Sequence, residues 1–252
     1  MTLATAPHHV LVLNPNTTAS ITALLQRHTA AALGTAAVVH TATARFGAPY
    51  IACEASYAVA AHAALDAWAG WCADHPQTAP SAVLVGCFGD PGLEALRESS
   101  PVPVTGLAEA AFAEAAAFGR FAVVTGGARW RPILQRLAHA LGHGTALAGI
   151  HTVAPSGAQL AADPDGARAL LAEACRDAVR TTGADAVVLG GAGLAGMAAA
   201  LQPLVAVPVI DSVQAGARQL LRLAGRPGAR PAAGLDSRWS GVSPALQALG
   251  PA

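Results

Sequence analysis

Short apolar runs alternate along this chain with longer stretches that are rich in alanine and leucine. The apolar runs end in polar or Gly-rich turns and have the length of buried strands, whereas the longer stretches have the length of helices. Strands and helices that alternate at these lengths are typical of parallel α/β sheets. We expect strands at 10–13, 37–39, 82–85, 121–124, 147–150 and 186–189, and helices at 19–33, 54–72, 132–141, 164–180 and 215–223.

The same order of elements occurs twice. Residues 82–110 read AVLVGCFGDPGLEALRESSPVPVTGLAEA, and residues 186–215 read AVVLGGAGLAGMAAALQPLVAVPVIDSVQA. Each copy has an apolar run, a Gly-rich turn, an Ala/Leu-rich stretch and a second strand that contains Pro-Val. The first turn carries Cys87, whereas Gly191 stands at the matching place in the second. A reaction that uses two facing groups, one from each copy, would therefore be left with one of them.

The length of the chain fits two units of this kind. A chain of 252 residues is long enough for one large domain or for two small lobes with a sizeable core. Parallel α/β units bring their strand-to-helix loops to the carboxyl ends of the strands, which is where such sheets bind ligands. We therefore expect the functional site in a cleft between two lobes.

The charge balance excludes several classes of partner. The formal net charge is +0, so there is no electrostatic basis for binding nucleic acid or an anionic membrane. A long uncharged run at 186–210 is interrupted by Pro203 and Pro208, so we predict no membrane-spanning helix. The N-terminus lacks the pattern of a signal peptide, and we expect a cytoplasmic protein that acts on a small-molecule substrate.

The spacing of the cysteines and the absence of lysine exclude several kinds of functional site. The cysteines lie far apart without a C-x-x-C pair, so we expect reduced thiols and neither a disulfide framework nor a metal site. All fifteen basic residues are arginine. The absence of lysine excludes a pyridoxal-phosphate Schiff base and a P-loop lysine.

Cys87 is the candidate catalytic residue. Removing a proton next to a carbonyl needs a base at one face of the carbon, and inverting the centre needs an acid at the other face. Cys87 follows an apolar strand and precedes Asp90-Pro91, which has the pattern of an N-cap followed by a first helical proline. We therefore expect its thiol near backbone N–H groups that favour the thiolate. The alternative is a buried, inert cysteine.

Other residues at strand ends are candidate substrate contacts. The turn formed by Gly191, Ala192 and Gly193 has backbone amides suited to a carboxylate or an enolate oxygen, or is simply a tight turn. Asn14 and Thr17 follow the first strand and are suited to binding a carboxylate or an imide, although Asn14 equally fits an Asx turn or a helix cap. Further candidates at the strand ends are Phe88, Gly89 and Thr125.

Three further titratable residues are expected near the predicted cleft. His151 follows a strand in the half that lost the cysteine and is a candidate replacement acid, although a lone loop histidine is more often structural. Glu109 and Asp211 stand near the last strands of the two repeats. We expect them to be acidic helix caps, with orientation of a group in the cleft as the alternative.

These pieces together resemble the aspartate/glutamate/hydantoin racemase superfamily, and most closely its hydantoin racemase branch. The resemblance extends in order over roughly nine-tenths of the chain. The matching pieces are L-N-P-N-T-T at 13–18, G-C-F-G-D-P-G-L at 86–93, G-L-A-E-A-A at 106–111, V-T at 124–125, L-G-G-A-G at 189–193 and P-V-I-D at 208–211.

The resemblance implies a cofactor-independent α/β enzyme with two pseudo-symmetric, flavodoxin-like lobes, parallel sheets and an inter-lobe cleft. Residues 1–105 plus 212–252 would form the first lobe, and residues 106–211 the second. Members of the family typically use two cysteines, one from each lobe, that flank an acidic carbon. The first maps to Cys87 and the second to Gly191, and Thr125 maps to a position that contacts the substrate.

Three functions are compatible with these observations. The first is a racemase or epimerase that removes and returns a proton at an acidic carbon of a hydantoin-like or amino-acid-derived substrate, with Cys87 as its single thiol. The second is a single-cysteine decarboxylase of the arylmalonate type; those enzymes keep the second-lobe thiol, so this chain would be their mirror arrangement. The third is a non-catalytic ligand-binding homologue. The exact substrate is left open, as is the choice between a monomer and a homo-oligomer.

Overall fold

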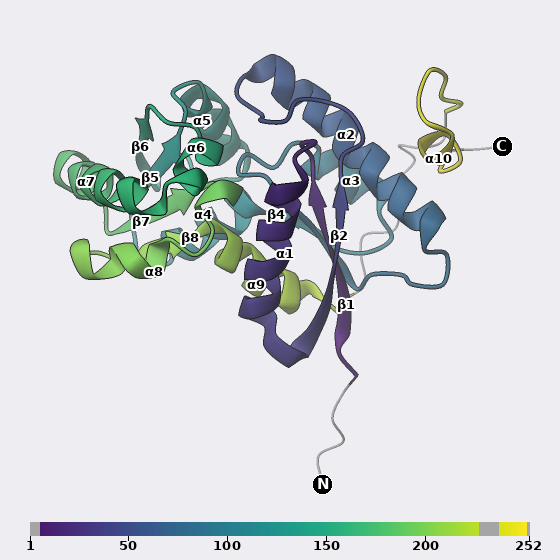
Figure 1. Cartoon of the computed structure of the whole chain (residues 1–252), viewed down its shortest axis with the longest axis horizontal. Helices are drawn as coiled ribbons and strands as arrows, with labels where there is room; N and C mark the ends of the chain where they lie inside the picture. The colour runs from purple at the N-terminus through teal and green to yellow at the C-terminus, as the bar shows by residue number, and fades with distance from the viewer. Residues whose placement is uncertain (1–5, 227–236, 251–252) are drawn as a thin grey trace, which may run out of the picture.

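The chain folds into two α/β lobes, each built on a four-stranded parallel sheet (Figure 1). The computed structural model describes residues 6–226 and 237–250. The strand order is β2-β1-β3-β4 in the first sheet and β6-β5-β7-β8 in the second, which is one flavodoxin-like order used twice. The predicted fold class is confirmed. The strands are β1 (His8–Asn14), β2 (Ala37–Thr43), β3 (Ala82–Val85), β4 (Val104–Gly106), β5 (Phe121–Gly126), β6 (Leu147–Val153), β7 (Ala186–Gly190) and β8 (Val209–Asp211).

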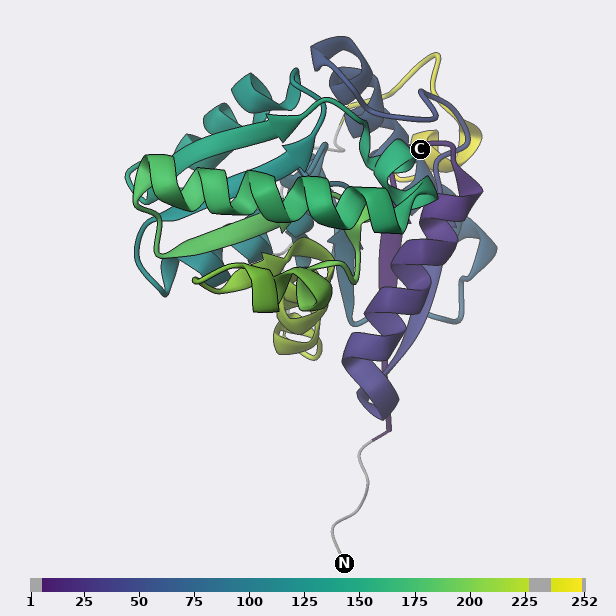
Figure 2. The same cartoon turned by 60° about the vertical axis from the view of Figure 1, so that its left-hand side comes forward.

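Helices connect the strands and cover the sheets. In the second lobe the long helix α7 lies across one face of the sheet and contacts β5 and β6 (Figure 2). Short 3-10 turns occur at Gly34–Ala36, Ala192–Leu194 and Gln202–Leu204. The α-helices are α1 (Ala19–Leu33), α2 (Glu54–Asp74), α3 (Leu93–Ser99), α4 (Leu107–Ala116), α5 (Trp130–Ala140), α6 (Gly157–Ala162), α7 (Pro164–Thr182), α8 (Ala198–Leu201), α9 (Ser212–Leu223) and α10 (Pro244–Gln247).

The two lobes exchange their last helices. Helix α4 follows β4 of the first sheet but also packs on β5, β7 and β8 of the second, and α9 follows β8 but also packs on β3 and β4 of the first. The two helices pack against each other between the sheets. This arrangement joins the lobes through buried apolar surface, so their relative position is set by the core rather than by a flexible linker.

An aromatic cluster links this shared core to the turn after β3. The ring of Phe88 meets the ring of Phe112 on α4 edge to face, with centroids 5.8 Å apart. Phe112 stacks in turn on Phe121 at the start of β5, at 5.3 Å. Because all three side chains are buried, the residue next to Cys87 is anchored in the interface between the lobes.

Several strands run further than the apolar pattern predicts, and the two edge strands β2 and β6 extend furthest at their carboxyl ends. Strand β2 continues to Thr43 beside β1, and β6 continues to Val153 beside β5. Backbone pairing with a neighbouring strand extends them, since it does not require apolar side chains on an edge strand. His151 therefore lies inside β6 and not in a loop that follows it.

Within residues 6–226 and 237–250, no helix is long and apolar enough to cross a bilayer. The same ranges hold no group of three or more His, Cys, Asp or Glu side chains that is arranged to bind a metal ion.

Candidate active site

The turn after β3 is held by contacts from several elements. The N–H of Gly86 donates to the carbonyl of Leu13 on β1 at 2.7 Å, and the N–H of Asp90 donates to the carbonyl of Cys87 at 3.0 Å. From α2, the Tyr57 hydroxyl donates to the carbonyl of Gly89 at 2.7 Å. These bonds give Cys87 a fixed position at the carboxyl end of the first sheet.

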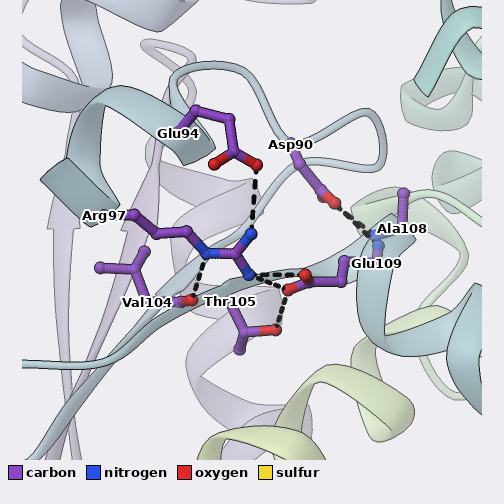
Figure 3. Close-up of polar contacts among 7 residues, drawn as sticks. All are labelled: Asp90, Glu94, Arg97, Val104, Thr105, Ala108 and Glu109. Carbon is purple, nitrogen blue, oxygen red and sulfur yellow. Dashed lines mark hydrogen bonds and ion pairs between the residues drawn. The ribbon is translucent and has the colours of Figure 1, made fainter. Parts of the chain in front are cut away.

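Asp90 caps α4 and not the helix that follows it in sequence. Its carboxylate accepts hydrogen bonds from the N–H groups of Ala108 at 2.9 Å and Glu109 at 2.8 Å (Figure 3). Helix α3 begins only at Leu93, with Gly92 at its N-cap. The expectation that Asp90 caps the nearer helix is therefore wrong. The pairing of β4 with β3 brings the start of α4 beside the turn, so two N–H donors reach the carboxylate there.

The Asp90 side chain is 2% exposed. Burial raises the pKa of Asp90 to about 7, although the two N–H donors of α4 act in the opposite direction. Asp90 also has a positive φ of 53°, which is uncommon for a residue with a side chain. The Cys87 turn and the start of α4 hold the Asp90 carboxyl in this buried position and uncommon backbone conformation.

Arg97 on α3 supports the same region from outside. Its guanidinium binds the carboxylate of Glu109 at 2.5 Å and donates to the carbonyl of Val104 at 3.1 Å (Figure 3). Glu109 also accepts a hydrogen bond from the Thr105 hydroxyl at 2.8 Å. Glu109 therefore belongs to an ion pair that braces α3 against β4 and α4. In the second lobe, Asp211 at the end of β8 is the acidic cap predicted for it and accepts from the N–H groups of Val213 and Gln214.

A pocket lies where the carboxyl ends of both sheets meet. Most of its walls come from the segments that follow β1, β3, β5 and β7. These strands stand at the reversal of strand order in each sheet, which is the expected ligand position. The segment between β2 and α2 supplies a further wall. A pocket between two lobes that is lined mostly by apolar groups and a few polar ones is typical of a small-molecule site. The lining residues are Asn16, Thr18, Ile21, Pro49, Tyr50, Ile51, Gly86, Cys87, Phe88, Thr125, Gly126, Trp130, Gly190, Gly191, Ala192 and Gly193.

The lining residues include no charged side chain. Their polar groups are amides, hydroxyls, one thiol and one indole N–H, and the remaining surface is apolar or aromatic. A pocket of this kind can orient a neutral polar ring by hydrogen bonds. A charged ligand would find no side chain of opposite charge there, so its transfer from water into the pocket would be costly.

The structure brings together six of the residues predicted for the site. Cys87 and Phe88 come from the first lobe, and Thr125 comes from the end of β5. The residues from the turn after β7 are Gly191, Ala192 and Gly193.

Three predicted substrate contacts lie outside the pocket lining. Asn14 is buried and donates to the Thr22 hydroxyl at 2.9 Å, and its side-chain oxygen accepts from the N–H of Asn16 at 3.2 Å. This is the Asx turn that was the alternative for Asn14. Thr17 donates its N–H to the carbonyl of Ala48, and its neighbours Asn16 and Thr18 line the pocket in its place. Gly89 is held by Tyr57 behind the turn.

His151 is also absent from the pocket lining. It pairs with Val124 within β6, two residues before the end of that strand. Its Nε2 lies 3.4 Å from the Thr181 hydroxyl of α7, and burial lowers its pKa. The expectation that it follows a strand is wrong because β6 is longer than its apolar core. The structure therefore does not bring His151 to the position of the missing cysteine.

Two aromatic residues of the pocket were missed in the sequence. Tyr50 lies in the segment between β2 and α2, and its hydroxyl donates to the carbonyl of Gly126 at 3.2 Å. Trp130 begins α5, and its indole N–H donates to the Tyr50 hydroxyl at 3.3 Å. Neither stands in a repeat or after a predicted strand, so no local pattern marked them. The one available signal was composition, because tyrosine and tryptophan are rare in this chain, with two and four residues.

The turn after β7 has a conformation that suits glycine. Gly191 has a φ of +139°, which side-chain-bearing residues rarely adopt. A Cβ at Gly190 would come within 2.1 Å of the Phe88 ring, so the two lobes approach closely here. The single change Gly191→Cys would strain this turn, even though the new Cβ would make only an ordinary contact with Leu194. The turn is thus built around glycine and differs from the Cys87 turn by more than one side chain.

Burial sets the protonation state of Cys87. The side chain is 8% exposed, and burial raises the pKa of its thiol well above the ordinary value, with the Asp90 carboxylate adding to the effect. The expectation of a lowered pKa is therefore wrong, because the nearest helix begins at Leu93 and the thiol lies among apolar groups. A raised pKa favours the neutral thiol of Cys87 at neutral pH.

The chain is similar to known racemases over most of its length. The model of a family described as Asp/Glu/Hydantoin racemase matches residues 10–220. A hydantoin racemase of Paenarthrobacter aurescens is 30% identical over 210 residues, which are 83% of this chain and 88% of that protein.

Solved structures show the same likeness. An allantoin racemase from Klebsiella pneumoniae superposes with a TM-score of 0.83 at 29% identity, covering 97% of this chain and 99% of that one. A variant of arylmalonate decarboxylase superposes with a TM-score of 0.65 at 19% identity, covering 88% of this chain and 96% of that one. At this lower identity the likeness shows a shared fold alone.

Proposed function

We propose that this chain, which belongs to the Asp/Glu/Hydantoin racemase family, is a cofactor-independent racemase of a neutral, hydantoin-like substrate. The observation that carries this proposal is the position of Cys87 in an uncharged pocket between the lobes. A free amino acid would bring an ammonium and a carboxylate, and each would lose its hydration without gaining a counter-charge. A hydantoin ring carries amide and imide groups that match the hydroxyls and backbone amides of the pocket.

The turn after β7 supplies groups for the charge that develops during the reaction. Ala192 and Gly193 begin a 3-10 turn, and the first N–H groups of such a turn have no partner within it. Both residues line the pocket. Backbone N–H groups in this arrangement are suited to an enolate oxygen, whose negative charge grows as the proton leaves. Gly191 is less suited because its N–H already donates to the Ser212 hydroxyl at 3.2 Å.

Cys87 is the proton-transfer group on the first-lobe face of the substrate. As a thiolate it takes the proton from the acidic carbon, and the bonding electrons move onto the neighbouring carbonyl oxygen. Return of a proton to the same face regenerates the substrate, whereas delivery to the opposite face gives the other enantiomer.

Deuterium exchange tests the proposal. One enantiomer of a 5-substituted hydantoin, incubated with the protein in D2O, is expected to lose optical rotation while deuterium enters at the acidic carbon. The rotation is measured by polarimetry and the exchange by NMR, beside a buffer control. If rotation and the carbon-bound proton both persist for several 5-substituents, the racemase proposal fails.

A second candidate is decarboxylation of an arylmalonate. The observation that favours it is the neutral thiol of Cys87, because loss of CO2 generates an enolate without a base and a thiol can then protonate it. The uncharged pocket speaks against it, since a malonate carries two carboxylates. Release of CO2 from an arylmalonate, without exchange of a hydantoin, would favour this candidate. Binding of either compound without any reaction would favour a non-catalytic homologue.

The pH dependence of the reaction separates the two chemical roles of Cys87. Because burial raises the pKa of the thiol, the thiolate is scarce at pH 7 and its fraction grows as pH rises. Racemisation that begins from the thiolate should show a kcat/KM that rises about tenfold per pH unit between about pH 6 and 9. Decarboxylation, which needs the thiol form, should stay flat over this range. A racemisation rate that falls with pH would contradict the base role of Cys87.

A further inference from the structure

The proposed racemisation needs a second proton-transfer group, and the pocket offers one. Inversion requires a proton from the face opposite Cys87, where Gly191 has no side chain. Among the described residues that line the pocket, the side chains that carry a thiol or a phenol are those of Cys87 and Tyr50. His151, the other candidate, lies on β6 against α7.

Tyr50 reaches across the cleft from the first lobe to the second. Its segment connects β2 to α2, but its hydroxyl donates to the carbonyl of Gly126 at the end of β5. Strand β5 pairs with β7, with Thr125 opposite Gly190. The phenol oxygen therefore lies against the strand next to the Gly191 turn. Cys87, by contrast, is carried by the turn after β3 of the first lobe.

The surroundings of the hydroxyl fit a group that gives up a proton. The indole N–H of Trp130 points to the phenol oxygen at 3.3 Å. A donor in this position stabilises negative charge on the oxygen once the proton has left. The bond that the hydroxyl itself donates goes to a backbone carbonyl, so turning this proton toward a substrate breaks a single hydrogen bond and leaves the Trp130 contact in place.

We propose that the Tyr50 hydroxyl is the second proton-transfer group of the racemase, acting on the face opposite Cys87. This inference rests on the proposed function. In one direction the Cys87 thiolate takes the proton from carbon, the electrons move onto the carbonyl oxygen, and the Tyr50 O–H gives its proton to the other face. The products are the Cys87 thiol, the Tyr50 phenolate and the inverted substrate. Exchange with water through the open mouth of the pocket then restores both groups, and the reverse direction starts from the phenolate.

The variant Tyr50→Phe removes the hydroxyl and keeps the ring. We expect its racemisation rate to fall about 100-fold or more. One enantiomer, whose proton faces Cys87, should still exchange with D2O at close to the parent rate and with retained configuration, while the other enantiomer loses exchange. The variant Cys87→Ser should show the opposite preference between the enantiomers. Exchange is followed by NMR and configuration by chiral chromatography, for each enantiomer separately.

A matched control distinguishes chemistry from closure of the cleft. Arg136 on α5 binds Glu54 at the start of α2 at 2.8 Å, so it also joins the lobes, and neither residue lines the pocket. Arg136→Gln should racemise at close to the parent rate. The inference is overturned if Tyr50→Phe racemises like the parent, if it slows exchange of both enantiomers equally, or if Arg136→Gln reproduces its effect. If the parent itself does not racemise a hydantoin, the proposed function has failed, which is a different result.

Discussion

Replacing Cys87 by alanine is expected to lower racemisation of a 5-substituted hydantoin by about 1,000-fold or more, together with deuterium exchange of the enantiomer whose proton faces Cys87. The thiol is the group proposed to transfer the proton on the first-lobe face of the substrate, and alanine has no proton to transfer. Initial rates for each enantiomer measure the effect, and circular dichroism checks that the variant is folded. Arylmalonate decarboxylation should be lost to a similar extent if that is the activity of the protein.

Cys72→Ala is the matched control for this experiment. Cys72 lies on α2 outside the pocket lining, and burial raises the pKa of its thiol to about 11. Losing this thiol should leave the rate close to that of the parent. Full activity in Cys87→Ala would contradict both enzymatic functions, since each depends on the same thiol.

Replacing Asp90 by alanine is expected to destabilise the protein by about 3 kcal/mol, because two N–H groups at the start of α4 lose their buried acceptor. For a chain of this size the melting temperature should fall by roughly 6–12 °C, as measured by differential scanning calorimetry. Asp90→Asn keeps the size of the side chain and one acceptor oxygen, so its melting temperature should fall less than that of Asp90→Ala. An unchanged melting temperature in Asp90→Ala would show that the cap does not contribute to stability.

The same pair of variants gives a pH signature. The pKa of Asp90 is about 7 in the folded protein, whereas an aspartate in an unfolded chain has a pKa of about 3.9. The folded state therefore binds the proton more strongly, and its stability should decrease as pH rises from about 4 to about 7. Asp90→Asn lacks this group, so its stability relative to the parent should improve over that range. A difference that is constant with pH would contradict a raised pKa.

Much of the fold follows from local patterns. The apolar runs at 82–85 and 186–189 become β3 and β7, because a short apolar run bounded by glycine fits a buried parallel strand. The repeat likewise predicts the common strand order of the two sheets. Edge strands are less predictable: β6 runs on past its apolar residues because pairing with β5 extends it.

The sequence by itself determined the α/β class, the duplicated order of elements and the presence of Cys87 in the pocket, because each depends on consecutive residues or on their place after a strand. Only the tertiary structure decided which partners the key side chains have. Asp90 caps a helix 18 residues away in sequence, and Tyr50 binds a carbonyl 76 residues away. Such contacts depend on which segments the strand order places side by side. Local patterns of hydrophobic and polar residues do not predict which segments these are.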